Sequence, residues 1–196
     1  MEWLPIMIGG FALGASYMVN DESGAQDAIY VVSSVDQRRY LVRNMPDRVE
    51  AADKMARIRA KLVRVVESMR ERFGSDARTR QMVRNFNADV LVEAARTSKY
   101  TSYSVNKGEK VVMCLRSRDD QEALVEDNML TFVALHELAH ICTPSVGHNQ
   151  EFWRNFKWIL QHAVSIQVYT PVDYSKQPQE YCGMQVTDSP LNNPSL

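Results

Sequence analysis

Hydrophobic positions recur at helical spacing in the first half of the chain. In residues 47–73 they fall every three or four positions, which predicts one helix with a single buried stripe. The positions of this stripe are Met55, Ile58, Leu62, Val66, Met69 and Phe73. Asn44 can cap this helix, Pro46 can start it and Gly74 can end it. We expect a shorter helix over residues 76–86.

Two segments have the composition of β-strands. Residues 29–43 are rich in β-branched and aromatic side chains, which predicts one strand or a short hairpin around Asp36 and Gln37. Residues 102–116 contain two such arms around Asn106-Lys107-Gly108, which predicts a hairpin whose turn uses the conformational freedom of Gly108. Residues 117–127 are acidic and polar, and we expect a loop there.

The second half of the chain predicts two more helices. Residues 128–141 are strongly apolar, so this helix should be buried, and Asn128 is a plausible N-cap. Pro144 should end it. A further helix should begin after Asn149, which has the residue type of an N-cap. The apolar positions of that helix are Phe152, Phe156, Ile159, Leu160 and Ala163.

The N-terminus carries the longest uncharged apolar segment. Residues 3–19 contain no charged side chain over 17 positions, which is close to the shortest length that spans a bilayer as a helix. We therefore expect residues 1–19 to form a single membrane anchor and residues 20–28 a polar linker. The first basic residues follow the anchor, which favours a cytoplasmic catalytic domain. The alternative is an apolar helix that packs on the domain.

Composition limits the remaining chain to one domain. The protein has 196 residues, of which 45% are hydrophobic and 24% charged, as in a globular protein. We assign residues 29–187 to this domain and residues 188–196 to a flexible tail. The net charge is only −1, but residues 38–84 carry +8 (14 basic, 6 acidic) and residues 119–196 carry −7 (3 basic, 10 acidic). The basic segment could bind nucleic acid, but a solvated helix face is the simpler interpretation and the one that we favour.

The three cysteines do not form a disulfide framework. Cys114, Cys142 and Cys182 are odd in number and widely spaced. Reduced thiols are the simpler interpretation, and one bridge with one free thiol is the alternative.

The apolar helix at 128–141 contains a polar group of residues with metal-binding spacing. His136 and His140 are four positions apart, so both imidazoles lie on one helix face and can reach one ion. Zinc accepts such neutral nitrogen ligands in tetrahedral geometry. Glu137 is placed to contact a metal-bound water rather than the metal. An ion also resolves the cost of burying these groups in an apolar helix.

A catalytic zinc site needs a third protein ligand and an open position. His148 is our candidate, because Gly147 permits a chain reversal and the next helix holds the residue in place. Glu151 or a later carboxylate is the alternative. We expect His162 to be packed or exposed rather than a ligand. Candidates for stabilising an oxyanion, by residue type only, are Tyr169, Tyr174, Tyr181 and His162.

The segment HELAHICTPSVGHNQEFW, residues 136–153, resembles the active-site segment of the WLM and SprT-like zinc metallopeptidases. The matching positions are His136, Glu137, His140, Gly147, His148, Phe152 and Trp153. The C-terminal part is similar to WLM-type proteins of large DNA viruses and algae. The resemblance implies an α+β fold: a small zincin-like, gluzincin-like core in which a β-hairpin or sheet precedes the active-site helix, here with an added N-terminal apolar helix.

The resemblance implies a zinc-dependent peptidase that holds one Zn²⁺ ion and acts on a protein or peptide. Glu137 would take a proton from the water, and a substrate strand could pair with the edge of the 102–115 hairpin. In its best-known members the family cleaves proteins crosslinked to DNA, so a DNA-associated protease is one alternative. A membrane-anchored binding or structural protein with a vestigial zinc site is the other.

Overall fold

The structure, a computed structural model, describes residues 27–196. The predicted anchor and N-terminal apolar helix, and most of the predicted linker, lie outside the described residues. Among the helices within 27–196, none combines the length and the apolar character needed to cross a membrane.

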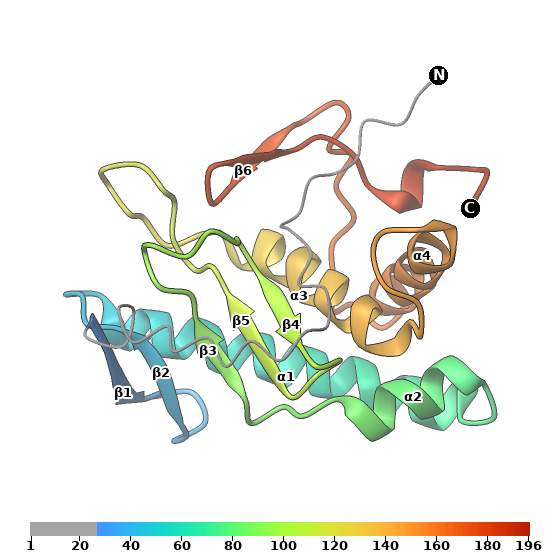
Figure 1. The fold of residues 1–196 in the computed structure, drawn as a ribbon, viewed down its shortest axis with the longest axis horizontal. Helices are drawn as coiled ribbons and strands as arrows, with labels where there is room; N and C mark the ends of the chain where they lie inside the picture. Colours follow the sequence, from blue (N-terminus) through green and yellow to red (C-terminus); the bar gives the residue numbers. More distant parts are fainter. Residues whose placement is uncertain (1–26) are drawn as a thin grey trace.

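A five-stranded mixed sheet and four α-helices make up the described chain, in agreement with the predicted α+β class (Figure 1). The sheet order is β1-β2-β3-β5-β4. β1 (Ala28–Val32) and β2 (Arg39–Arg43) form the first hairpin, which confirms the hairpin form of that prediction. Its turn contains Gln37, whose φ is positive, at 60°.

The first helix, α1 (Arg48–Phe73), confirms the longest helical stripe. The helix begins at Arg48, two residues after Pro46. Asn44 is therefore not its N-cap and Pro46 is not its first residue, so both predictions were wrong. Asp47 is the N-cap residue, but its side chain makes no capping bond; it accepts a hydrogen bond from Arg116 Nη1 at 2.6 Å instead. The predicted shorter helix is α2 (Ala77–Asn85), capped by Asp76.

Three more strands complete the sheet. Helix α1 packs against this sheet. β4 (Tyr103–Val105) and β5 (Lys110–Met113) form the predicted antiparallel hairpin. β3 (Leu91–Glu93) was not predicted, because three residues are too few to show an alternating pattern. It pairs in parallel with both β2 and β5 and so joins the two hairpins into one sheet. As a result β4 is an edge strand of the sheet.

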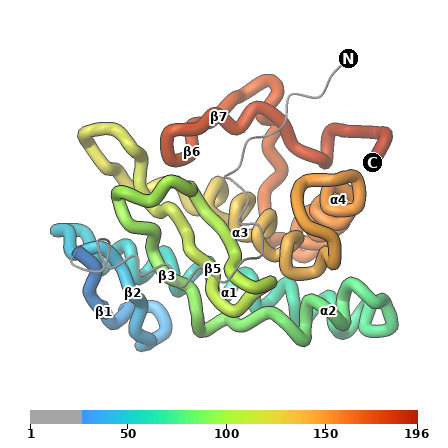
Figure 2. Tube along the Cα trace, viewed as in Figure 1, coloured from blue at the N-terminus to red at the C-terminus, as the bar shows by residue number. Residues whose placement is uncertain are grey.

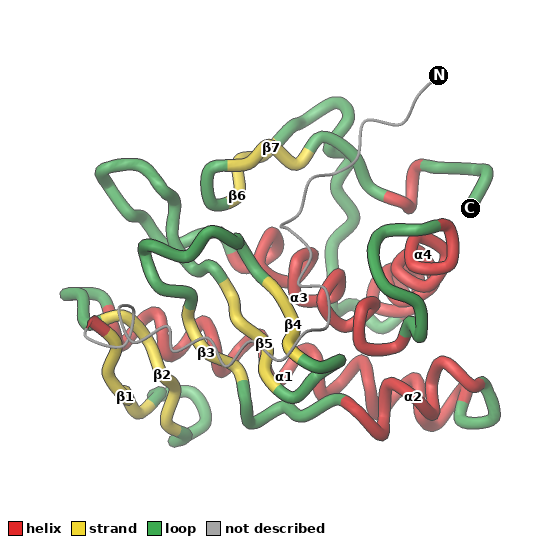
Figure 3. The backbone as a smooth tube through the Cα atoms, in the orientation of Figure 1, coloured by secondary structure: helices red, strands yellow, loops and turns green. Residues whose placement is uncertain are grey.

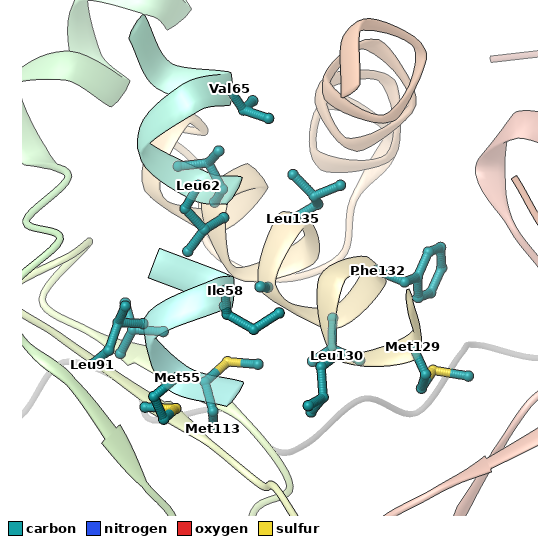
Figure 4. Packing of buried hydrophobic residues seen from close by; sticks show 14 of the residues in the cluster. Met55, Ile58, Leu62, Val65, Leu91, Met113, Met129, Leu130, Phe132 and Leu135 are labelled. Carbon is teal, nitrogen blue, oxygen red and sulfur yellow. The ribbon is translucent and has the colours of Figure 1, made fainter. Parts of the chain in front are cut away.

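The core lies where α1 meets the sheet on one side and α3 (Asp127–Cys142) on the other (Figure 4). Ile58 and Leu62 of α1 face the labelled side chains of both neighbours, and Leu135 of α3 is fully buried. Helix α3 begins at Asp127 with Glu126 as N-cap, so Asn128 is not the N-cap. The amide of Asn128 instead binds the backbone of Thr170, with an Nδ2···O distance of 2.9 Å.

The last helix, α4 (Gln150–Ser165), packs on α3 and is capped by Asn149, as predicted. The C-terminal segment then passes to the side of α3 opposite α1 and α2 (Figure 2). It contains a small hairpin that was not predicted, β6 (Gln179–Tyr181) and β7 (Met184–Val186), separate from the main sheet (Figure 3).

The expected flexible tail, residues 188–196, lies against α4. A short 3₁₀-helix, η2 (Pro190–Asn192), is part of it. Lys157 of α4 donates hydrogen bonds to two backbone oxygens of the tail, those of Asn193 and Leu196, at 2.6 and 3.2 Å.

A disulfide joins Cys114 at the end of β5 to Cys182 in the β6–β7 turn, and Cys142 is a buried free thiol. The structure therefore has the arrangement that we treated as the alternative, one bridge and one free thiol, rather than three reduced cysteines. The fold brings together Cys114 and Cys182, which are 68 positions apart in the sequence. The number and spacing of cysteines cannot show such a pairing.

Candidate metal centre

The three predicted ligand histidines converge at one point. His136 and His140 project from one face of α3, one turn apart, and His148 comes from the loop that leads into α4. The Nε2 atoms of His136 and His140 are 3.2 Å apart, and the Nε2 atom of His148 lies 3.0 Å from each of them. Gly147 has a positive φ of 88°, which supports the predicted chain reversal before His148.

This triangle of ring nitrogens fits a zinc ion. An Nε2 atom offers either one proton or one lone pair, so three such atoms cannot all satisfy one another by hydrogen bonds. One cation within reach of all three atoms would accept all three lone pairs. Tetrahedral zinc with Zn–N distances of about 2.0–2.1 Å places its nitrogen ligands about 3.3 Å apart, close to the spacing found here. His136, His140 and His148 could therefore hold a metal ion.

The protonation of the three rings also favours metal binding. Burial lowers the pKa of His136 well below its ordinary value, with smaller effects from His140 and His148. Burial, followed by His148 and Lys107, lowers the pKa of His140 to about 3, and burial lowers the pKa of His148. The neutral imidazole is the form that binds a metal.

Aromatic side chains of α4 fix the orientation of the ring cluster. Phe152 stacks on the His140 ring with centroids 4.3 Å apart and an interplanar angle of 27°. Trp153 packs against His148 at 5.7 Å, and Phe156 meets His136 edge-on at 5.1 Å. The apolar stripe of α4 therefore also forms the wall of the candidate metal centre.

Glu137 is buried beside the histidines and contacts β4. Ser104 donates to its carboxylate both from the backbone N–H and from the hydroxyl. Burial raises the pKa of Glu137 to about 8, against the lowering effect of both Ser104 hydrogen bonds. Such a carboxylate is a stronger proton acceptor than an exposed one, which suits a general base.

Two residues at this site were missed by the sequence analysis. Ser104 holds the Glu137 carboxylate, and Lys107 donates to three backbone oxygens at the end of α3 and in the following loop. Both lie in the predicted 102–116 hairpin, but nothing in its sequence shows which helix it contacts.

Of the other candidates, His162 lies elsewhere. Its Nε2 is 3.0 Å from Ser68 Oγ, and its ring packs on Phe73, in agreement with our expectation that it is packed. The Tyr169 hydroxyl donates to that of Tyr174 at 3.4 Å, and both rings pack on Phe132, one helical turn before His136.

Tyr181 belongs to a closed ring of hydrogen bonds. Its hydroxyl lies 2.5 Å from Ser102 Oγ and donates to the backbone oxygen of Cys114 at 2.9 Å. The backbone N–H of Cys114 donates to Ser102 Oγ at 3.0 Å. Each hydroxyl thus both donates and accepts once, so the oxygen of Tyr181 is already engaged by protein groups.

Part of the basic segment 38–84 is neutralised by acidic residues outside it. Arg38 and Arg59 both pair with Asp89, at 3.0 and 2.8 Å. Lys54 and Arg57 both pair with Asp127 at the start of α3, at 2.6 and 2.7 Å. These pairs support the interpretation of this face as a solvated, paired helix surface.

Comparison with known proteins gives one family. The WLM domain family matches residues 35–193. Uncharacterized protein R325 of Acanthamoeba polyphaga mimivirus is 31% identical over 169 residues, which cover 84% of this chain and 85% of that protein. Uncharacterized protein 136R of Invertebrate iridescent virus 6 is 33% identical over 84 residues, 42% of this chain and 47% of that protein.

Among solved structures, Wss1 from Saccharomyces cerevisiae has a similar fold. The TM-score is 0.50 with 21% sequence identity, and the match covers 64% of this chain and 87% of that chain.

Proposed function

This chain belongs to the WLM domain family, and we propose that it is a zinc-dependent peptidase with Glu137 as general base. The observation that carries the proposal is the triangle of three histidine Nε2 atoms, 3.0–3.2 Å apart, with a buried carboxylate on the next residue of the same helix. The chemistry of this group of residues matches hydrolysis of a peptide bond better than simple storage of an ion, because a structural zinc site needs no general base.

Each residue has a separate task in this mechanism. His136, His140 and His148 would hold the ion, which when bound supplies a Lewis acid and lowers the pKa of a water molecule. The Glu137 carboxylate would take a proton from the attacking water and pass it to the nitrogen of the leaving amine. Ser104 holds the carboxylate in one orientation through two hydrogen bonds.

The substrate is a protein or peptide bound in extended form along β4. This strand is an edge of the five-stranded sheet, so one side of its backbone is not used by the sheet. Ser104 is the register partner of Val111 in β5. Its backbone N–H donates to Glu137 and not to β5. An added strand beside β4 would place its peptide groups next to the base.

Two alternatives share the same site. A binding or structural protein with a vestigial zinc site would bind zinc without hydrolysis. A protease that acts on DNA–protein crosslinks would also bind DNA through the 38–84 segment, with an affinity that falls steeply with salt. Association with a membrane through residues 3–19, with the catalytic domain in the cytoplasm, stays a prediction.

The test pairs zinc stoichiometry with proteolysis. Zinc is counted by elemental analysis on the purified full chain, and an unfolded casein substrate is assayed with the wild type and with Glu137→Gln. We expect one zinc in both proteins and cleavage only in the wild type. Cleavage by Glu137→Gln at the wild-type rate would exclude the general base, zinc without cleavage in either protein would favour the vestigial site, and absence of zinc would refute the proposal.

A further inference from the structure

We propose that Lys107 is a positioning residue that fixes edge strand β4 against the C-terminal end of α3, and so holds His140 and the loop to His148 in ligand geometry. This inference rests on the proposed function and goes beyond it. It concerns a residue outside the histidine–glutamate motif, on a different element of the fold.

The Lys107 ammonium group uses all three of its donors on backbone oxygens. It donates to His140 O at 3.2 Å, to Thr143 O at 2.6 Å and to Ser145 O at 2.8 Å. Lysine has three N–H donors and no acceptor, so these bonds satisfy it completely. One of the three oxygens belongs to a candidate ligand residue, and another lies three residues before His148.

The charge of Lys107 matches its surroundings. No carboxylate within the described residues forms an ion pair with it, whereas the last carbonyls of a helix carry partial negative charge that favours a cation. Thr143 is the C-cap residue of α3, and the chain leaves the helix there. The ammonium group therefore joins the end of α3 to the first residues of the ligand loop.

The backbone at Lys107 has a conformation that side chains rarely adopt. Asn106, Lys107 and Gly108 all have positive φ, at 46°, 58° and 116°, and Gly108 N–H donates to Val105 O at 3.0 Å. Turns of this kind prefer Asn followed by Gly. A lysine at the second central position is strained, and such strain marks a residue whose side chain is needed at that place.

The hairpin is thus attached to α3 at two points. Ser104 contacts Glu137, and Lys107, three residues on, contacts Thr143, six residues on. Ser104 in β4 and Lys107 in the following turn together hold the hairpin against α3, beside Glu137 and the candidate ligand histidines.

Two variants separate positioning from general stability. Lys107→Gly removes the ammonium group and relieves the strained turn, because Asn-Gly is the preferred pair there. Lys107→Met removes the ammonium group and keeps the strain. Lys110→Met is the matched control, since Lys110 is an exposed residue of the same hairpin whose ammonium group has no partner among the described residues.

The measurements are made on the full chain. They are the zinc dissociation constant by competition with a chromogenic chelator, the melting temperature of the metal-free protein, and kcat and KM on a casein-derived peptide. We expect both Lys107 variants to bind zinc about tenfold more weakly, as when a support of a metal ligand is removed, and to lose kcat more than KM. Lys107→Gly should nevertheless melt no lower than the wild type, and Lys110→Met should match the wild type throughout.

Wild-type zinc affinity and kcat in Lys107→Gly would overturn the proposal. The proposal would also be overturned if zinc affinity followed the melting temperature alone. In that case Lys107→Met would bind zinc more weakly, and Lys107→Gly would bind it as the wild type does. A wild type that binds zinc and cleaves, with unaffected variants, leaves the proposed function intact and refutes only the role of Lys107. A wild type that binds no zinc refutes both.

Discussion

Ser104 and Glu137 are joined by two hydrogen bonds, one from the backbone N–H and one from the hydroxyl of Ser104 to the Glu137 carboxylate. Both bonds favour the charged carboxylate, and burial opposes them more strongly. The pKa of Glu137 consequently rises from its ordinary value of 4.5 to about 8 in the metal-free protein. At neutral pH the metal-free site therefore holds a protonated Glu137 next to three neutral imidazoles.

The first prediction concerns the stability of the metal-free protein at different pH. Because the pKa of Glu137 is higher in the folded state than in the unfolded state, its contribution to stability is complete at low pH and is lost as the pH rises toward about 8. The three histidines have lowered pKa values and act in the opposite direction, only below their ordinary value of 6.5. Between about pH 6.5 and pH 8.5, we expect the free energy of unfolding to fall by about 1–2 kcal/mol.

Urea unfolding in the presence of a chelator, at both ends of this pH range, measures the effect. Glu137→Gln cannot titrate and should show a flat profile over the same range. An equal slope in the two proteins would show that another group is responsible.

The second prediction concerns zinc and the histidine triad. Zinc that binds only the folded state should stabilise the wild type by about 4 kcal/mol when its free concentration is about 1,000 times the dissociation constant. Replacement of His136, His140 or His148 by alanine should abolish the zinc-dependent rise in melting temperature. His162→Gln is the control, because His162 contacts Ser68 and not the triad. Loss of the zinc effect in this control would refute the assignment of the ligands.

The third prediction compares two glycines with positive φ. A Cβ atom on Gly108, where φ is 116°, would lie 2.4 Å from the backbone oxygen of Asn85, which cannot move freely. On Gly183, where φ is 82°, the nearest atom is Arg118 Cδ at 3.5 Å, an ordinary contact. We expect Gly183→Ala to cost about 1 kcal/mol from backbone strain alone, and Gly108→Ala to cost about 3 kcal/mol or more because overpacking adds to the strain. Urea unfolding measures the loss of unfolding free energy in both variants. An equal loss in the two variants would contradict the prediction.

The fourth prediction concerns the Cys114–Cys182 disulfide. The bridge ties the β6–β7 turn to the end of β5, and its two cysteines are 68 positions apart. Loss of a native disulfide that closes a long loop costs about 2–5 kcal/mol. Reductant should therefore lower the melting temperature of the wild type and of Cys142→Ala, which keeps the bridge. Cys182→Ser should already melt at the lower temperature and should not respond to reductant, and a response there would exclude this bridge as the cause.

The sequence predicted those parts of the fold that depend on neighbouring residues. Helical periodicity predicted the stripes of α1 and α4 and the convergence of His136 and His140. Turn residues between two β-rich arms predicted the hairpin at Asn106-Lys107-Gly108. The start of α3 was placed one residue too late and its N-cap was assigned wrongly, because Asn128 has a tertiary partner in Thr170. Local preference cannot anticipate such a competing contact.

The remainder could not be read from the sequence, for physical reasons. β3 has three residues and is stabilised by parallel neighbours on both sides rather than by its own composition. Lys107 donates to three backbone oxygens. Every residue has such an oxygen, so the side chains at these positions give no sign of the contact. The Cys114–Cys182 pairing depends on the placement of the C-terminal hairpin, which only the assembled fold defines.

The contact of Tyr181 and Cys182 with the end of β5 has a consequence for synthesis of the protein. A ribosome releases the chain from its N-terminus, so His136, His140 and His148 emerge before Tyr181 and Cys182 do. During translation the candidate metal ligands are therefore present before Tyr181 and Cys182 can complete the hydrogen bonds and the disulfide at the end of β5. A chain that stops before residue 181 would carry all three candidate ligands and still lack this closure at the end of β5.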